Sequence, residues 1–141
     1  MVITFDDSIE EVAKTRRPHT LKEAVEWGCA FGNKGAFLRE FLDHFYASDQ
    51  SLKTHMLIEM PPLTPDVKNN AYIAAVAEHL ALKNHLKVPQ WSGHKDRFLH
   101  KPYFPCGLES LKATLIKESP VSFRRRLIFV GSDVLSRPHS H

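Results

Sequence analysis

The stretch GAFLREFLDHFYAS, residues 35–48, is the clearest indication of how this chain folds. Its large apolar residues recur with helical spacing, which places them on one side of an α-helix and leaves most of the charged residues on the other. These apolar residues are Phe37, Leu38, Phe41, Leu42 and Phe45. Because each fully buried Phe or Leu contributes about 1.5–3 kcal/mol, we expect this face to anchor the core.

Cap signals place further helices on both sides of this stretch. Thr20 and Glu23 have capping-box spacing and open a helix that ends at Gly32, and Thr64 with Pro65 predicts the start of the longest helix. The predicted helices cover residues 8–16, 20–31, 35–48, 51–59, 64–86 and 108–117, with short helical turns after Pro120 and Ser132. No hairpin signal is present, and residues 127–130 are the only candidate strand. The sequence therefore predicts an all-α, single-domain helical bundle over residues 1–141, with an ordered C-terminal extension.

The segment KVPQWSGHKDRFLHKPYFPCG, residues 87–107, interrupts the helical pattern. Its three prolines and two glycines predict an irregular connector with one helical turn near residues 95–99. Four aromatic residues alternate with basic ones: Trp91, Phe98, Tyr103 and Phe104 with His94, Lys95, Arg97 and Lys101. Such a set can stack single-stranded nucleic acid, but aromatic rings that fill the bundle while the cations stay in water are the commoner arrangement.

Composition favours a globular cytoplasmic protein. Of the 141 residues, 43% are hydrophobic and 25% are charged, and no apolar run approaches the roughly 20 residues that cross a bilayer. The acidic start of the chain lacks the pattern of a secretory signal, and Cys29 with Cys106 does not indicate a disulfide framework. We therefore expect a cytoplasmic location and no membrane partner.

Positive charge is concentrated towards the C-terminal end. Residues 1–90 contain 10 Lys or Arg and 12 Asp or Glu, a net charge of −2, whereas residues 91–141 contain 9 and 4, a net charge of +5. A basic region of this kind attracts acidic proteins or phosphate groups. A solvated basic surface without a partner is the commoner explanation of such a charge.

Three consecutive arginines, at positions 124–126, are the strongest candidate for a binding site. On a helix, three successive side chains spread over about 200°, so they cannot all contact one ligand. Arg124 and Arg125 have the chemistry to bind a carboxylate or a phosphate, while Arg126 faces elsewhere. The alternative is that one arginine pairs with Glu118 or another acidic residue and the others are solvated. The full set predicted to bind a partner or an anion is Arg124, Arg125, Arg126, Arg97 and Trp91.

Two segments of the C-terminal half resemble a family of small uncharacterised bacterial proteins. AYIAAVAEHLALKNHLKVPQW, residues 71–91, is similar to a helix followed by VPxW, and ESPVSFRRRLIFVGSDVLSR, residues 118–137, is similar to an ending of the form ESPxxFRRRxIFVxxDxLSR. Members of that family can lie beside regulatory or toxin–antitoxin genes. The resemblance therefore implies a protein partner such as a toxin or a regulator, but it implies no activity and identifies no functional residue.

Motifs for metal or covalent chemistry are weak. His79 and His85 lie six positions apart on the longest predicted helix and point about 120° away from each other, so they cannot share a metal ion there. Cys106 becomes a candidate nucleophile only if a histidine such as His100 lies beside it. We expect no metal and no cofactor.

These patterns favour a non-enzymatic protein-interaction module, with the basic C-terminal motif and the aromatic connector as its contact surface. Nucleic-acid binding by the same basic region is one alternative. A small metal- or cysteine-dependent enzyme that uses His94, His100 or Cys106 is another.

Overall fold

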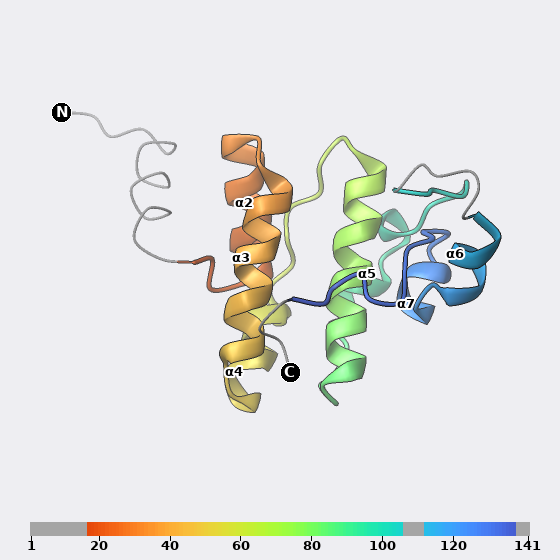
Figure 1. Cartoon of the computed structure of the whole chain (residues 1–141). Helices are drawn as coiled ribbons and strands as arrows, with labels where there is room; N and C mark the ends of the chain where they lie inside the picture. Colours follow the sequence, from red (N-terminus) through yellow and green to blue (C-terminus); the bar gives the residue numbers. More distant parts are fainter. Residues whose placement is uncertain (1–16, 106–111, 138–141) are drawn as a thin grey trace. The chain divides into compact units, whose positions relative to one another are not determined.

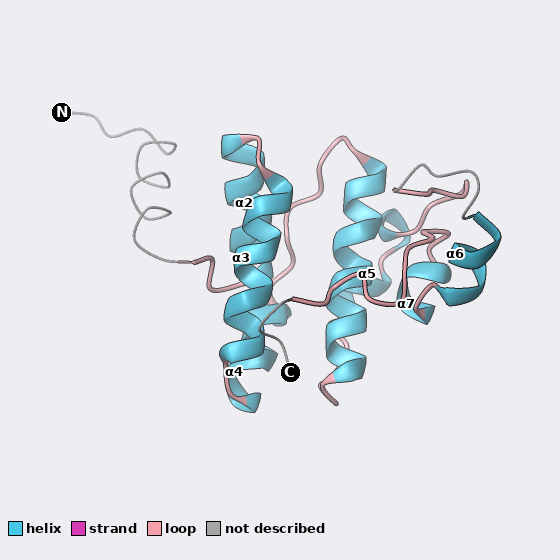
Figure 2. Cartoon of the chain, viewed as in Figure 1, coloured by secondary structure: helices cyan, strands magenta, loops and turns pink. Residues whose placement is uncertain are grey.

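A computed structural model describes residues 17–105 and 112–137 of the chain. Its regular elements are helices, which confirms the predicted all-α class (Figure 2). The described part contains no strand, and the candidate strand at 127–130 makes one isolated β-bridge, between Tyr103 and Ile128. The helix predicted for residues 8–16 lies outside the described residues. No described helix has the length and apolarity needed to span a membrane.

The chain divides into two compact units. Unit 1 comprises Met1–Pro62 with Arg137–His141, and unit 2 comprises Leu63–Ser136. Unit 1 contains α2 (Leu21–Phe31), α3 (Lys34–Ala47) and α4 (Gln50–Ile58), as labelled in Figure 1. Unit 2 contains α5 (Val67–Lys83), α6 (Lys112–Glu118), α7 (Val121–Arg124) and two short 3-10 helices, η1 (Gln90–Gly93) and η2 (Lys95–Arg97). That the two units form a single domain stays a prediction.

Helix α2 begins and ends where the sequence predicts, because both of its ends are capped. The Thr20 hydroxyl accepts a hydrogen bond from the Glu23 amide (3.0 Å), and Gly32 ends the helix with a φ of +70°, which glycine adopts without strain. Helices α2 and α3 lie side by side (Figure 1). Gly28 permits this contact, since a Cβ atom there would lie 2.9 Å from Lys34 Cα.

The apolar face of α3 contributes to the core of unit 1, as its periodicity predicts. Phe41, Leu42 and Phe45 are at most 3% exposed. Phe37, one turn earlier, is half-buried and meets the buried Trp27 ring edge-on, with ring centres 5.7 Å apart. This face therefore binds α2 through aromatic contacts.

Helix α5 is the central element of unit 2. Its buried alanines are Ala71, Ala74, Ala75, Ala77 and Ala81, all fully covered. Small side chains let neighbouring backbones approach closely, and α7, η1 and η2 all pack against this helix. Helix α5 is therefore covered on several sides by other elements of its unit.

The start of α5 differs from the prediction. Asp66, not Thr64, is the N-cap, and its carboxylate accepts hydrogen bonds from the amides of Lys68 and Asn69. Thr64 is instead held by Asn70, whose side-chain oxygen accepts the Thr64 amide at 2.8 Å. The Thr64 hydroxyl also donates a hydrogen bond to this Asn70 oxygen (3.1 Å), a contact that the capping pattern of the sequence does not predict.

Within the motif at 118–137, a hydrogen bond joins residues on the two sides of α7. Pro120 precedes α7 as expected, but Ser119 does not cap that helix. The buried Ser119 hydroxyl instead accepts a hydrogen bond from the Val130 amide at 2.9 Å. Leu127, which ends the turn after α7, has a φ of 63°, so the chain reverses there.

Candidate functional site

Arg126 connects three elements of unit 2. Its side chain is fully buried, and its guanidinium donates hydrogen bonds to the backbone carbonyl oxygens of Ser122 in α7 (2.8 Å) and Ser92 in η1 (2.7 Å). The same group lies 3.4 Å from Glu78 Oε1 in α5 and 4.6 Å from the centre of the Phe98 ring. Burial lowers the pKa of Arg126, and the charge of Glu78 opposes this shift. With these contacts, Arg126 holds α5, η1 and α7 together.

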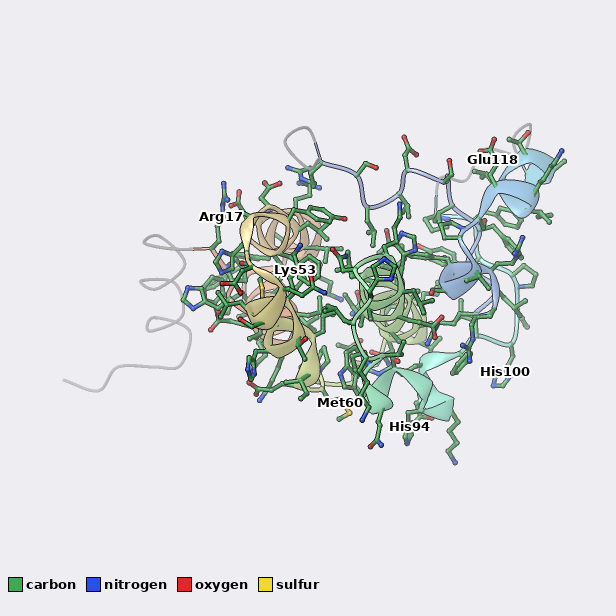
Figure 3. All side chains as sticks on the ribbon, turned by 90° about the horizontal axis from the view of Figure 1, so that it is seen from below. Arg17, Lys53, Met60, His94, His100 and Glu118 are labelled. Atoms are coloured by element: carbon green, nitrogen blue, oxygen red, sulfur yellow. The ribbon has the colours of Figure 1, made fainter. Side chains whose placement is uncertain are left out.

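The other two arginines of the run reach the surface. Arg125 Nη1 lies 3.0 Å from the same Glu78 oxygen, and the Arg125 side chain is 52% exposed whereas that of Glu78 is 6% exposed. Arg124 is exposed and has no side-chain partner within the described residues. The acidic residue that pairs with the run is Glu78 in this structure, while Glu118 is exposed at the end of α6 (Figure 3). One carboxylate faces two guanidinium groups, so positive charge remains uncompensated beside it.

Arg97 is the second buried arginine of unit 2, at 1% exposure. Its Nη1 donates to the backbone carbonyl oxygen of Asn70 (3.3 Å), and its guanidinium lies 4.9 Å from the centre of the Trp91 ring. Burial lowers the pKa of Arg97, and the charge of Asp96 opposes this shift. Arg97 and Arg126 thus lie inside the unit and Trp91 is half-buried, whereas Arg124 and Arg125 are the members of the predicted binding set that face solvent.

Each aromatic ring of the connector is partly buried and has a cation of the same unit over it. The pairs are Trp91 with Arg97 (4.9 Å), Phe98 with Arg126 (4.6 Å), Tyr103 with Lys68 (4.8 Å) and Phe104 with Lys112 (5.1 Å), measured to the ring centres. Phe104 also stacks on Phe129, with ring centres 5.1 Å apart. A cation–π contact contributes about 0.5–1 kcal/mol even where it is exposed to water, so these partly buried pairs stabilise the packing of unit 2.

A half-open groove of about 350 Å³ lies on the surface of unit 2. The segment before α5, the first turns of α5 and the connector line it, and its wall is mainly apolar. The lining residues are Leu63, Thr64, Val67, Asn70, Lys95, Asp96, Phe98, Leu99 and His100. Leu63 and Val67 remain 44% and 62% exposed. The volume lies in the range of binding sites in proteins, about 300–1,000 Å³.

Three arginines, Arg97, Arg125 and Arg126, contact residues that line this groove. Phe98 lies against the guanidinium groups of both Arg125 and Arg126, and Asn70 accepts the hydrogen bond of Arg97. The Asn70 amide also donates to the Thr64 carbonyl oxygen at 2.8 Å, which fixes the opposite wall. The buried Arg97 and Arg126 therefore support the lining from inside the unit, while Arg125 reaches the surface beside Phe98.

The residues considered for metal or covalent chemistry are not brought together in the described part of the chain. His94 and His100 are exposed on the outer side of the connector, and of the two only His100 lines the groove (Figure 3). Cys106 lies outside the described residues, so a pairing with His100 stays a prediction. Within residues 17–105 and 112–137, no three His, Cys, Asp or Glu residues are grouped closely enough to hold a metal ion.

Sequence reasoning missed Glu78, Ser92 and the groove itself. A signal for Glu78 was present, because it is an acidic residue in an alanine-rich run at a position that the helical period buries, and a buried carboxylate needs a partner. Ser92 binds Arg126 through its backbone carbonyl oxygen, for which the side chain gives no signal. The groove forms from segments that are about 30 positions apart, which no local pattern reveals.

Comparison of the chain with known protein families, with curated proteins and with solved structures finds no match. The resemblance of residues 71–91 and 118–137 to a bacterial family therefore stays a prediction.

Proposed function

We propose that the chain is a non-enzymatic protein-interaction module whose contact surface is the groove of unit 2. The observation that carries this proposal is the pair of apolar side chains, Leu63 and Val67, that stay exposed beside an apolar wall. A concave apolar site with a few polar groups at its edge is typical of binding sites. A partner that covers these side chains removes their apolar surface from water, at about 25 cal/mol per Å².

The distribution of charge supports the same surface. Residues 63–136 contain 11 Lys or Arg and 6 Asp or Glu, a net charge of +5, whereas the remainder of the chain contains 8 and 10, a net charge of −2. Arg125 lies 5.3 Å from the centre of the Phe98 ring, and Phe98 lines the groove, so positive charge adjoins the apolar wall. In this proposal Arg124 and Arg125 face the partner, while Arg126 and Arg97 support the wall.

Nucleic-acid binding is the competing proposal for this basic unit. Such binding without sequence preference combines a basic path for the backbone with aromatic faces on which bases stack. The connector rings of the unit are partly buried and have cations of the chain itself over them, which favours a protein partner.

Site-specific photocrosslinking in cells that express the protein tests this proposal. A photoreactive phenylalanine analogue replaces Val67 in one variant and Val121 in the other. Both valines are the first residue of a helix, and they are 62% and 54% exposed, so the two variants are matched. We expect a discrete protein adduct from position 67 and none from position 121. An adduct that nuclease removes supports nucleic-acid binding instead, and the absence of any adduct at position 67 contradicts the proposed module.

A further inference from the structure

The groove has an unbalanced positive edge. Lys95 and Asp96 are the residues of its lining with opposite charges, but the charge of Asp96 also acts on the buried Arg97, whose pKa it raises against the effect of burial. The Lys95 ammonium group is exposed and forms no ion pair with any carboxylate in the described residues. Asp96 is one carboxylate against two neighbouring cations, Lys95 and Arg97, so positive charge remains in excess beside the groove.

Arg125 adds a second cation next to the groove. Its guanidinium lies against Phe98 and shares the single carboxylate of Glu78 with Arg126, at 3.0 and 3.4 Å respectively. Because Arg126 is buried and Arg125 is half-exposed, the excess positive charge of this cluster is accessible at Arg125. Positive charge beside an apolar wall selects a partner that carries the opposite sign.

We propose that the groove binds a short segment of a partner protein in which a bulky apolar side chain is flanked by Asp or Glu. This inference rests on the proposed function and specifies the chemistry of the partner. The apolar side chain packs against Val67 and Phe98, and the flanking carboxylates pair with Lys95 and Arg125. The half-open shape suits a segment that crosses the surface, because sites for small molecules enclose about 70–90% of their ligand. A basic segment is disfavoured, since like charges repel at this edge.

A display library of random short peptides, selected against the full-length protein, tests this inference. We expect the enriched peptides to combine a Leu, Ile, Phe or Trp with neighbouring Asp or Glu. The Val67→Asp substitution should weaken the binding of a synthetic enriched peptide by about tenfold or more, because a carboxylate replaces an apolar contact and repels the acidic flanks. Lys95→Glu should also weaken it, since the substitution reverses the charge at the edge of the groove.

Val121→Asp is the matched control, because it makes the same substitution at the first residue of α7 and changes the net charge equally. An acidic residue in the first turn of α5 agrees with the helix dipole, so Val67→Asp is compatible with the fold. Enrichment of basic or uncharged peptides, no enrichment at all, or equal binding by the wild type and Val67→Asp overturns the acidic-segment inference. A protein adduct at position 67 in the crosslinking experiment still supports the interaction module in each of these cases, so the two proposals fail separately.

Discussion

Arg126 donates hydrogen bonds to backbone carbonyl oxygens in η1 and α7 and faces Glu78 in α5. Truncation of one partner of a buried ion pair leaves the other polar groups without compensation, at a cost of about 3–5 kcal/mol. We therefore expect Arg126→Ala to lower the free energy of unfolding by about 3 kcal/mol or more in urea denaturation. Arg124→Ala removes an exposed arginine of the same run and should change the free energy of unfolding by less than about 0.5 kcal/mol. Similar effects of the two substitutions would contradict the structural role of Arg126.

His79 makes the stability of the protein depend on pH. Burial, and then the charge of Lys83, lowers the pKa of His79 from its ordinary value of 6.5. The unfolded chain takes up this proton as the pH falls through about 6.5, whereas the folded chain takes it up only at lower pH, so the unfolded state binds more protons in between. The neutral His79 therefore makes its full contribution to the free energy of unfolding above about pH 7. This contribution decreases as the pH falls, first through the pKa of His79 in the unfolded chain and then through its lower pKa in the folded chain. Urea denaturation between about pH 8 and about pH 5 should show a smaller loss of stability in His79→Gln than in the wild type. Equal losses in both proteins would assign the pH dependence to other groups.

Gly28 sets the distance between α2 and α3. A Cβ atom at this position meets the backbone Cα of Lys34 at 2.9 Å, so one helix must move, and we expect Gly28→Ala to destabilise the protein by about 1–3 kcal/mol. Gly35→Ala is the contrasting substitution. A Cβ atom there meets only the flexible end of Arg39, and alanine has the higher helix propensity, so this change should stabilise α3 by up to about 1 kcal/mol. Thermal unfolding followed by circular dichroism measures the stability of both variants. A melting temperature that shifts in the same direction in both would rule out the close contact at Gly28 as the cause of the change in stability.

Elements with local signals could be predicted from the sequence, whereas their ends and partners depend on distant residues. Thr20 caps α2 through a hydrogen bond three positions away, and the helical period of α3 identifies its buried face. The start of α5 was misplaced because Thr64 and Asp66 are both good N-caps, and the contact with Asn70 engages the first of them. The sequence predicts that the three arginines spread over a helix, whereas α7 ends at Arg124, and Arg125 and Arg126 lie in the turn that follows and share Glu78. Only the fold shows that Arg126 is the buried member of the run. Its partner Glu78 lies 48 positions away, so neither the ion pair nor the groove that it supports follows from a local rule.

The chain passes from unit 1 into unit 2 and returns, so that Arg137 again belongs to unit 1. Arg137 Nε lies 2.9 Å from Asp43 Oδ1, 94 positions earlier in the sequence. The hydrogen bond to Asp43 raises the pKa of Arg137 above its ordinary value. Closing so long a loop costs conformational entropy, and the cost is smaller when the residues between the two ends are already folded. The folding of unit 2 therefore favours the ion pair in unit 1.

We consequently expect the two units to unfold together, as the single-domain prediction requires. The chain contains two tryptophans, Trp27 in unit 1 and Trp91 in unit 2. Replacement of either by Phe leaves one tryptophan that reports on one unit, while far-ultraviolet circular dichroism reports on the helices of both. In each variant the urea transitions followed by fluorescence and by circular dichroism should coincide, because coincident transitions are the test of a cooperative unit. Adding Arg137→Ala should then shift the transition in both variants equally. If the units unfold separately, the two probes disagree and Arg137→Ala changes only the transition reported by Trp27.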